Sequence, residues 1–331
     1  MSIKLSILDQ SPVRQGGTPE QALAETVELA ELADGLGYYR FWVSEHHSTA
    51  AYAGSAPEVL LAAIGARTRK IRIGSGGIML PHYSTFKVAE VASVLATLFP
   101  GRIDLGLGRA PGADMATARE LSHDGNPRFH LFPQQTQDLL DKLANKRYRP
   151  KIFPRPETNP DVWMLGTSPD SAMLAAELGL PYNFALFINP DMETGIIGRY
   201  REHFVPSDNL SEPYAGLTVN VYCAETEERA RQLALARQLS MLRVVTGGGF
   251  SGIGPVEEAE QYPYSSQERE YIAQRGRHDA IGTPGQVREQ ILRLAEKYDA
   301  DEITTVTITY DFEERKRSYE LLADAFNLGR D

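Results

Sequence analysis

The chain has 331 residues, with 34 Lys and Arg against 44 Asp and Glu, and 42% of its residues are apolar. This composition is close to the globular average and excludes wholesale disorder and collagen-like structure. A formal net charge of -10 disfavours binding to a nucleic-acid backbone or an anionic membrane surface. We therefore expect neither nucleic-acid nor membrane partners. The single cysteine, Cys223, cannot make an internal disulfide, so we expect a cytoplasmic protein.

Short runs with β-strand character recur along the chain and alternate with segments of helical spacing. Eight such runs are predicted, at residues 3–8, 39–44, 71–76, 102–108, 162–166, 182–186, 217–223 and 303–308. Strands that alternate with helices form parallel sheets, and eight units are the number that closes a barrel. We therefore predict a (β/α)8 TIM barrel, with a doubly wound open sheet as the alternative.

The clearest helix start lies near the carboxyl end of the chain. Thr283 can be its N-cap, Pro284 occupies the first helical position, and Gln286 completes a capping box. Apolar residues follow at helical spacing from Val287 to Tyr298. We find no linker to a second domain and predict a single barrel domain over residues 1–331.

Two stretches, at about 110–130 and 246–280, interrupt the alternation and are predicted to be insertions. The second is rich in glycine and tyrosine, a composition that suits a mobile excursion. We favour a lid as its role, and a solvated insertion without function is the alternative. Aromatic and histidine side chains in these loops are candidates to line a substrate pocket. They are Phe129, His130, Phe250, Tyr262 and Tyr264.

In a parallel barrel the reactive groups lie where strands end. The second strand ends in Glu45, His46 and His47, and strand alternation places Glu45 and His47 on one face and His46 on the other. The trio can supply an acid/base imidazole with Glu45 orienting a partner, or can be purely structural. A metal site is the weakest interpretation, because a His-x-His spacing and further carboxylates are missing, and we predict no metal.

The third strand ends at Gly76 and Gly77, where the lack of side chains lets the backbone approach a flat ligand, although a simple turn needs the same residues. In the fourth strand, Ile103, Leu105 and Leu107 alternate with small or acidic residues, which would leave the barrel mouth open. Arg109 follows directly and is either an anion partner or one half of a surface ion pair.

The fifth strand ends at Gly166 and is followed by Thr167, Ser168, Pro169 and Ser171. Ser168 or Thr167 can cap a helix that opens with Pro169, and the free N–H groups of such a helix start bind phosphate readily. Asp170 in the first turn supports the alternative of an ordinary cap. Together with Arg109, this helix start is the local anion site that an acidic protein needs to hold a phosphate.

These motifs, in this order, resemble the bacterial luciferase-like flavin monooxygenase family. The segments that carry the resemblance are residues 45–47, 74–81, 106–109, 166–171 and 281–287. The resemblance implies a barrel that works as a homodimer and binds reduced FMN, which a separate flavin reductase supplies. It also implies that reduced FMN and dioxygen form a flavin hydroperoxide that oxidises a small organic substrate.

The resemblance also assigns roles to residues. Arg109, Thr167, Ser168 and Ser171 would hold the FMN phosphate, and Gly166 opens the same cofactor-binding segment. The Gly76–Gly77 peptide, which is often cis in this family, would lie against the isoalloxazine ring. His46 corresponds to the family's catalytic histidine, with Glu45 and His47 beside it.

Two departures from luciferase argue against light emission: Gly108 stands where luciferase has a reactive cysteine, and Thr167 where it has a glutamate. A deazaflavin-dependent hydride-transfer enzyme of the same fold is one alternative function. A metal-dependent barrel hydrolase and a flavin-binding protein without turnover are two others. Cys223, on the apolar face of the seventh strand, is expected to be a core residue.

Overall fold

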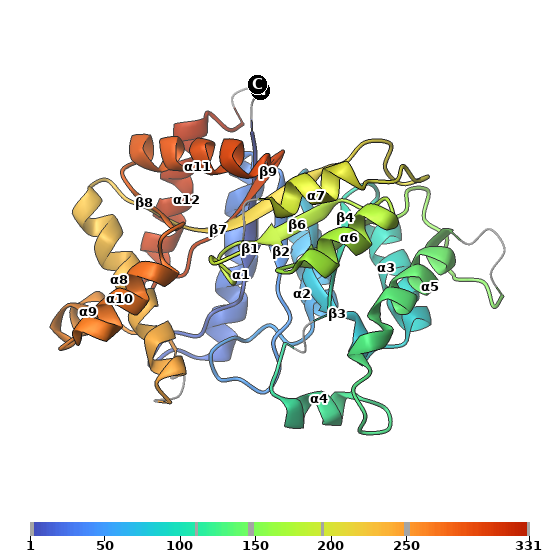
Figure 1. Ribbon diagram of the computed structural model, residues 1–331, viewed down its shortest axis with the longest axis horizontal. Helices are drawn as coiled ribbons and strands as arrows, with labels where there is room; N and C mark the ends of the chain where they lie inside the picture. Colours follow the sequence, from blue (N-terminus) through green and yellow to red (C-terminus); the bar gives the residue numbers. More distant parts are fainter. Residues whose placement is uncertain (1–2, 110–111, 145–148, 193–194, 248–251, 330–331) are drawn as a thin grey trace.

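Eight parallel strands close into a barrel in the computed structural model, which describes residues 3–109, 112–144, 149–192, 195–247 and 252–329 (Figure 1). They are β1 (Lys4–Asp9), β2 (Arg40–Val43), β3 (Arg72–Met79), β4 (Ile103–Gly108), β5 (Asp161–Gly166), β6 (Tyr182–Ala185), β7 (Ala215–Cys223) and β9 (Glu302–Val306). The barrel closes because β1 pairs with both β2 and β9, and β7 pairs with both β6 and β9. The predicted TIM barrel is confirmed, and the open-sheet alternative is wrong.

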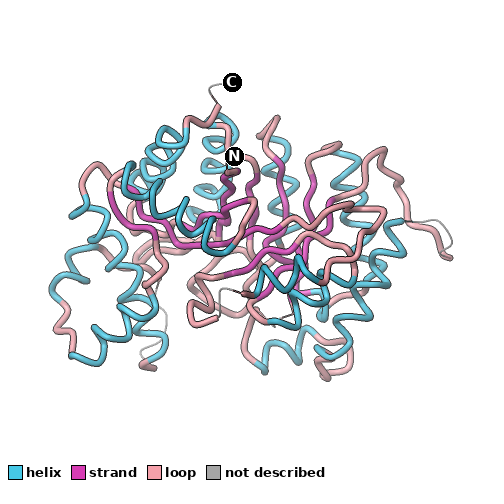
Figure 2. Tube along the Cα trace, turned by 45° about the horizontal axis from the view of Figure 1, so that its top comes forward, coloured by secondary structure: helices cyan, strands magenta, loops and turns pink. Residues whose placement is uncertain are grey.

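Helices surround the strands as an outer layer (Figure 2). They are α1 (Pro19–Leu36), α2 (Pro57–Arg67), α3 (Thr85–Leu98), α5 (Phe132–Ala144), α6 (Pro169–Glu177), α7 (Ile196–Glu202), α8 (Glu227–Val245), α11 (Pro284–Tyr298) and α12 (Phe312–Phe326). The predicted start of α11 is confirmed, since Thr283 is its N-cap and donates its backbone N–H to Gln286 Oε1 at 2.9 Å. No helix among the described residues is long and apolar enough to cross a membrane.

Strand alternation sorts the side chains of the barrel as predicted. Ile103, Leu105 and Leu107 of β4 are buried in the core between strands and helices. Cys223 of β7 is 1% exposed in the same core, where burial raises the pKa of its thiol to about 12. Cys223 is therefore a core residue, as predicted.

Buried ion pairs fill the amino-terminal end of the barrel interior. Arg40, the first residue of β2, pairs with Asp104 at 2.7 Å and with Glu302, the first residue of β9, at 3.1 Å. Burial of three charges is tolerated because each has a partner of opposite sign. This end of the barrel is therefore occupied by protein, and the carboxyl end is the one that can receive a ligand.

The third strand extends beyond its predicted end. β3 continues from Gly76 to Met79, and its register against β4 shifts between Gly76 and Ile78. The Gly76–Gly77 peptide is cis, as the resemblance implied. The two glycines thus belong to the strand at the barrel mouth and are not part of a simple turn.

Both expected insertions contain helices (Figure 1). The first contains α4 (Met115–Leu121) and the short 3-10 helix η2 (Phe129–Leu131). The second contains α9 (Val256–Gln261), α10 (Ser266–Arg275) and β8 (Ala280–Gly282), which pairs with the end of β7.

Residues 252–280 contain packed helices, although their composition suggested a loosely packed excursion. Val256 and Ala259 of α9 are buried against α8, and Tyr262 and Tyr264 pack on the same cluster. The tyrosines between these short helices are partly buried and pack against this cluster. The remainder of the glycine run, at 248–251, and with it Phe250, lies outside the described residues.

Candidate functional site

Glu45 follows β2 at the barrel mouth and is 2% exposed. Its Oε1 accepts hydrogen bonds from His47 Nε2 at 2.7 Å and from the Tyr83 hydroxyl at 2.8 Å, and its Oε2 accepts one from the Met79 backbone N–H at 3.1 Å. Burial and the neighbouring carboxylate raise the pKa of Tyr83, which stays a neutral donor. Glu45 therefore ties the ends of β2 and β3 together and orients His47.

His46 points away from Glu45 and His47, as strand alternation predicted. Its Nδ1 lies 3.0 Å from Ser44 Oγ, and its ring stacks on Tyr52 with centroids 4.5 Å apart and planes at 28°. Burial, followed by the positive Arg237 and by His47, lowers the pKa of His46 to about 4. The His46 imidazole is consequently neutral at physiological pH.

Sequence reasoning missed the polar residues that lie behind His46. Arg237 of α8 donates from Nη2 to the Tyr52 hydroxyl at 2.8 Å. Asp279 accepts a hydrogen bond from Asn220 Nδ2 of β7 at 2.9 Å, and burial raises the pKa of its carboxyl to about 6. Tyr52 lies in a loop, Arg237 on a helix, Asn220 within β7 and Asp279 directly before β8, and no local motif marks them.

The described residues contain no group of three His, Cys, Asp or Glu side chains that could hold a metal ion. At the mouth, both oxygens of Glu45 already accept hydrogen bonds, and His46 points away from His47. Within this part of the chain, the geometry gives the metal-dependent hydrolase no set of ligands.

Arg109 and the start of α6 lie together beside the mouth. Arg109, at the end of β4, places Nη1 3.9 Å from the carboxylate of Asp170 in the first turn of α6. Ser168 is the N-cap of α6 but makes no side-chain cap hydrogen bond, and Ser171 Oγ donates to the Ser168 carbonyl at 2.7 Å. The carbonyl of Thr167 accepts a hydrogen bond from Asn189 Nδ2 at 3.2 Å. The structure thus brings the four predicted phosphate-binding residues to one helix start.

The glycines at these strand ends are required by close packing. A Cβ atom on Gly166 would lie 2.0 Å from Ser171 Oγ, one on Gly76 2.5 Å from Leu8 Cδ1, and one on Gly77 2.8 Å from the Gly106 carbonyl oxygen. Neighbouring atoms of the barrel therefore pack directly against the backbone of β3 at Gly76 and Gly77, and α6 approaches β5 closely at Gly166.

Gln10 is a second feature that sequence reasoning missed. It follows β1 at the mouth, is 7% exposed, and its Oε1 has no hydrogen-bond partner among the described residues. Buried side-chain oxygens without a partner are uncommon, because each one costs about 1–3 kcal/mol in desolvation. The position of Gln10 at a strand end is the signal that could have identified it.

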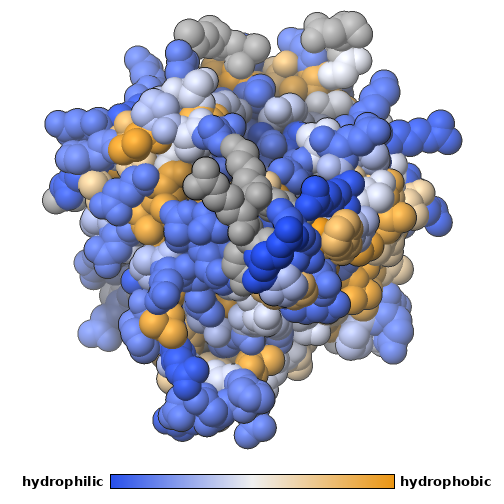
Figure 3. Space-filling model, turned by 90° about the vertical axis from the view of Figure 1, so that its right-hand side faces the viewer, coloured by the Kyte–Doolittle hydropathy of each residue, from blue (hydrophilic) through white to orange (hydrophobic). Residues whose placement is uncertain are grey.

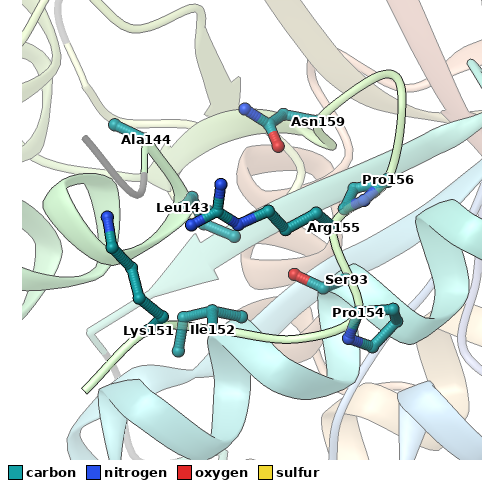
Figure 4. Close-up of a pocket in the computed structure, with 9 residues that line it drawn as sticks. All are labelled: Ser93, Leu143, Ala144, Lys151, Ile152, Pro154, Arg155, Pro156 and Asn159. Atoms are coloured by element: carbon teal, nitrogen blue, oxygen red, sulfur yellow. The ribbon is translucent and has the colours of Figure 1, made fainter. Parts of the chain in front are cut away.

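Two cavities are found among the described residues. The larger, about 420 Å³, lies between α3, α5 and the segment before β5, where the side chains of Lys151, Arg155 and Asn159 surround it (Figure 4). The smaller, about 280 Å³, is lined by His82 and Tyr83 among others. Because Tyr83 donates to Glu45, this second cavity lies next to the Glu45–His47 pair.

The aromatic residues expected around a substrate divide between two regions. Phe129 lies near the smaller cavity, with its ring centroid 6.0 Å from that of His82. The ring centroids of Tyr262 and Tyr264 lie 4.8 Å apart, and both rings pack on the cluster between α8 and α9. The packing of these two tyrosines accounts for their presence without a substrate.

A closed barrel with imidazoles, a carboxylate and an arginine at neighbouring strand ends defines the class of (β/α)8 proteins whose site lies at the carboxyl mouth. Residues 3–301 match the family described as luciferase-like monooxygenase, and the chain belongs to this family. Relatives named as monooxygenases support an oxidoreductase.

Similarity to known proteins extends over nearly the whole chain. YwcH of Bacillus subtilis (strain 168) is 46% identical, covering 98% of this chain and 99% of its own. The N-acetyl-S-alkylcysteine monooxygenase of the same organism is 38% identical, covering 98% of both chains. Among solved structures, apo-MsnO8 is 38% identical with a TM-score of 0.93 and covers 98% of this chain and 99% of its own.

Two more distant structures share the fold alone. One is the oxygenating constituent of 3,6-diketocamphane monooxygenase from Pseudomonas putida in complex with FMN, at 17% identity and a TM-score of 0.70. The other is an F420-dependent secondary alcohol dehydrogenase, at 12% identity and a TM-score of 0.69. They cover 98% of this chain and 97% and 99% of their own, respectively.

Proposed function

We propose that this protein is an FMN-dependent monooxygenase that uses reduced FMN and dioxygen to oxidise a small organic substrate. The observation that carries the proposal is the meeting of Arg109 with the start of α6 beside the bare backbone of Gly76 and Gly77. A cation and an N-terminal helix turn suit a phosphate, and a strand segment without side chains suits the close approach of a flat ring. Relatives named as monooxygenases support the same reaction class.

The mouth fits a flavin in two further respects. Ser168 makes no side-chain cap hydrogen bond, so the first N–H groups of α6 remain for an anion. The buried Oε1 of Gln10 lacks a partner among the described residues and suits a ligand N–H or O–H. When bound, reduced FMN would supply the two electrons that dioxygen activation needs. Arg109, Thr167, Ser168 and Ser171 would hold its phosphate.

His46 is the residue to which we assign proton transfer. Its Nδ1 is held by Ser44, which leaves Nε2 to accept and return a proton at a substrate oxygen. Glu45 and His47 do not act as a second acid/base pair in this proposal, because Glu45 holds His47 in place. Replacement of His46 by Ala should keep FMN binding and lower turnover, whereas unchanged turnover would reject the role.

We also propose a homodimer that contacts through α2 and α3. These helices pack side by side and expose large apolar side chains: Val59 is 68%, Val94 44% and Leu98 59% exposed. Figure 3 shows apolar side chains interspersed with charged ones on the side of the molecule where α3 and α5 lie. A separate flavin reductase would supply the reduced FMN, in keeping with the resemblance. Sedimentation of the wild-type chain and of a Val94→Lys/Leu98→Lys variant tests the dimer, which the variant should dissociate.

Isotope labelling tests the proposed reaction. The purified chain, a flavin reductase, FMN and ¹⁸O₂ are incubated with N-acetyl-S-alkylcysteine, the compound class in the name of a 38% identical relative, and with other small thioethers and ketones. The proposal expects one ¹⁸O atom in the product and the other in water. Substrate oxidation with F420 and no label incorporation would instead establish the deazaflavin alternative. Flavin binding without any product across the panel would favour a non-catalytic flavoprotein.

A further inference from the structure

We propose that Arg237 is a positioning residue that acts through Tyr52 to set the orientation and the electrostatic environment of His46. Arg237 lies on α8, and Tyr52 lies in the loop after β2, 185 residues away in the chain. The Arg237 guanidinium donates to the Tyr52 hydroxyl at 2.8 Å. A helix outside the barrel thereby reaches the imidazole at the mouth through one aromatic side chain.

Tyr52 is held in place from two sides. Its backbone forms an antiparallel bridge with Pro12, and the next residue, Ala53, donates its N–H to the Ser11 carbonyl at 2.9 Å. Its hydroxyl is bound by Arg237, and its ring lies on His46 with centroids 4.5 Å apart. With backbone and hydroxyl both fixed, the tyrosine ring limits the rotamers open to His46.

The charge of Arg237 acts on His46 in the same direction as burial. After burial, Arg237 and then His47 are the groups that act on His46, and both disfavour its imidazolium form. Glu45, the nearest carboxylate, is directed at His47, Tyr83 and Met79. Among the described residues, the influences on His46 are thus burial, Arg237 and His47, and all three oppose a positive charge on its ring.

Asp279 is a buried carboxyl group whose charge acts on Arg237. The groups that act on Arg237 are Tyr52, Tyr222 and Asp279, and those that act on Asp279 include Asn220, Gln238, Arg237 and Arg275. Burial raises the pKa of Asp279 to about 6, so this carboxylate is ionised at neutral pH and gains a proton in mild acid. Protonation of Asp279 leaves the Arg237 charge less compensated, which opposes protonation of His46 further.

The inference deepens the proposed function, because it explains how the proposed proton-transfer residue stays neutral. It can be tested without flavin or substrate. The pKa of His46 is measured by NMR titration of its ring protons in the apo protein, and the signal is assigned by its loss in His46→Gln. A catalytic failure of the protein would not alter this readout, so the two proposals fail separately.

The comparison uses three variants of α8. Arg237→Met should raise the pKa of His46 by about half to one unit, the order expected when a nearby cation is removed. Arg237→Lys, which keeps the charge, should restore most of the wild-type value. Arg243→Met is the matched control, because Arg243 lies on the same helix and pairs with Glu258 at 2.7 Å, and it should leave the pKa unchanged.

Two results would overturn the inference. One is an unchanged His46 pKa in a folded Arg237→Met protein, and the other is an equal shift in Arg243→Met. If Arg237→Met does not fold, Arg237→Gln gives the same comparison, since it removes the charge and keeps a donor for Tyr52. Where turnover is measurable, the acid limb of the kcat/KM profile should move to higher pH in Arg237→Met and return in Arg237→Lys.

Discussion

Oε1 of Glu45 lies 2.7 Å from Nε2 of His47, while His46, between them in sequence, points to Ser44 and Tyr52. The two histidines therefore have different environments despite being adjacent. His47 is bound to a buried carboxylate, and His46 is a neutral imidazole beside a cation. The three consecutive residues thus divide between a hydrogen-bonded pair, Glu45 with His47, and a separate imidazole, His46.

Replacement of Glu45 by Gln should destabilise the protein. The amide loses one acceptor oxygen, so at least one of the three donors, His47, Tyr83 or the Met79 N–H, is left without its partner. We expect a loss of about 1–3 kcal/mol in the free energy of unfolding, measured by urea denaturation. Glu202→Gln, at an exposed position, should change stability little; equal effects in the two variants would contradict the account.

The activity should not depend on a group that titrates near pH 6.5. Because the pKa of His46 is lowered to about 4, its neutral form persists from pH 8 to about pH 5. We expect kcat/KM to be level across this range and to fall only below it. An acid limb centred near pH 6.5 that disappears in His46→Gln would show that His46 titrates normally.

The lowered pKa of His46 makes the stability of the protein depend on pH. The unfolded histidine gains a proton near pH 6.5 and the folded one only near pH 4, so this group makes the protein less stable as pH falls between these values. Asp279 acts oppositely, since its raised pKa favours the folded state in acid and this contribution is lost as pH rises through about 6. Relative to wild type, His46→Gln should therefore lose less stability between pH 7 and pH 4.5, and Asp279→Asn should lose more. The free energy of unfolding is measured by urea denaturation at both pH values. An equal change in all three proteins between pH 7 and pH 4.5 would refute both assignments.

Replacement of Gly166 by Ala should disturb the start of α6. The added Cβ would lie 2.0 Å from Ser171 Oγ and 2.4 Å from Ser171 Cβ, so the helix or the strand must move. We expect a destabilisation of about 1–3 kcal/mol and weaker FMN binding. Gly198→Ala in α7, where a Cβ would contact nothing within 4 Å, should instead stabilise by about 0.5–1 kcal/mol. A Gly166→Ala/Ser171→Gly double variant should recover part of the lost stability, and no recovery would argue against the steric cause.

Gln10 should show opposite effects on stability and on binding. Replacement by Met removes a buried acceptor that has no partner in the described part of the protein, so the free energy of unfolding should stay level or increase. Binding of reduced FMN or of substrate should weaken, because a polar contact at the mouth is lost. A variant that is less stable and binds normally would show that the Gln10 side chain has a structural partner instead.

Much of the fold could be predicted because it depends on local pattern. Each of the eight expected runs overlaps a strand of the barrel, and the Thr283–Gln286 capping box lies where four adjacent residues indicate it. The candidate site residues at strand ends could be predicted for the same reason, because in a parallel barrel the end of a strand lies at the mouth.

The remainder depends on contacts between segments that are distant in sequence. Arg237 and Asp279 meet the His46 region only through tertiary packing, and nothing next to either residue in the chain marks it. The short strand β8 was missed because it is three residues long and exists by pairing with β7. The lack of a partner for Gln10 Oε1 among the described residues becomes apparent only when the neighbouring hydrogen bonds are known.

The most direct test of the proposed cofactor site is an anaerobic titration of the protein with photoreduced FMN, followed by tryptophan fluorescence. We expect saturation at one FMN per chain, and an affinity that falls by about 1.5–3 kcal/mol, tenfold to over a hundredfold, in Arg109→Ala. Arg293→Ala, which removes an exposed arginine paired within α11, should bind like the wild type. Equal affinity in Arg109→Ala and wild type, or saturation with reduced F420 but not with reduced FMN, would contradict the account.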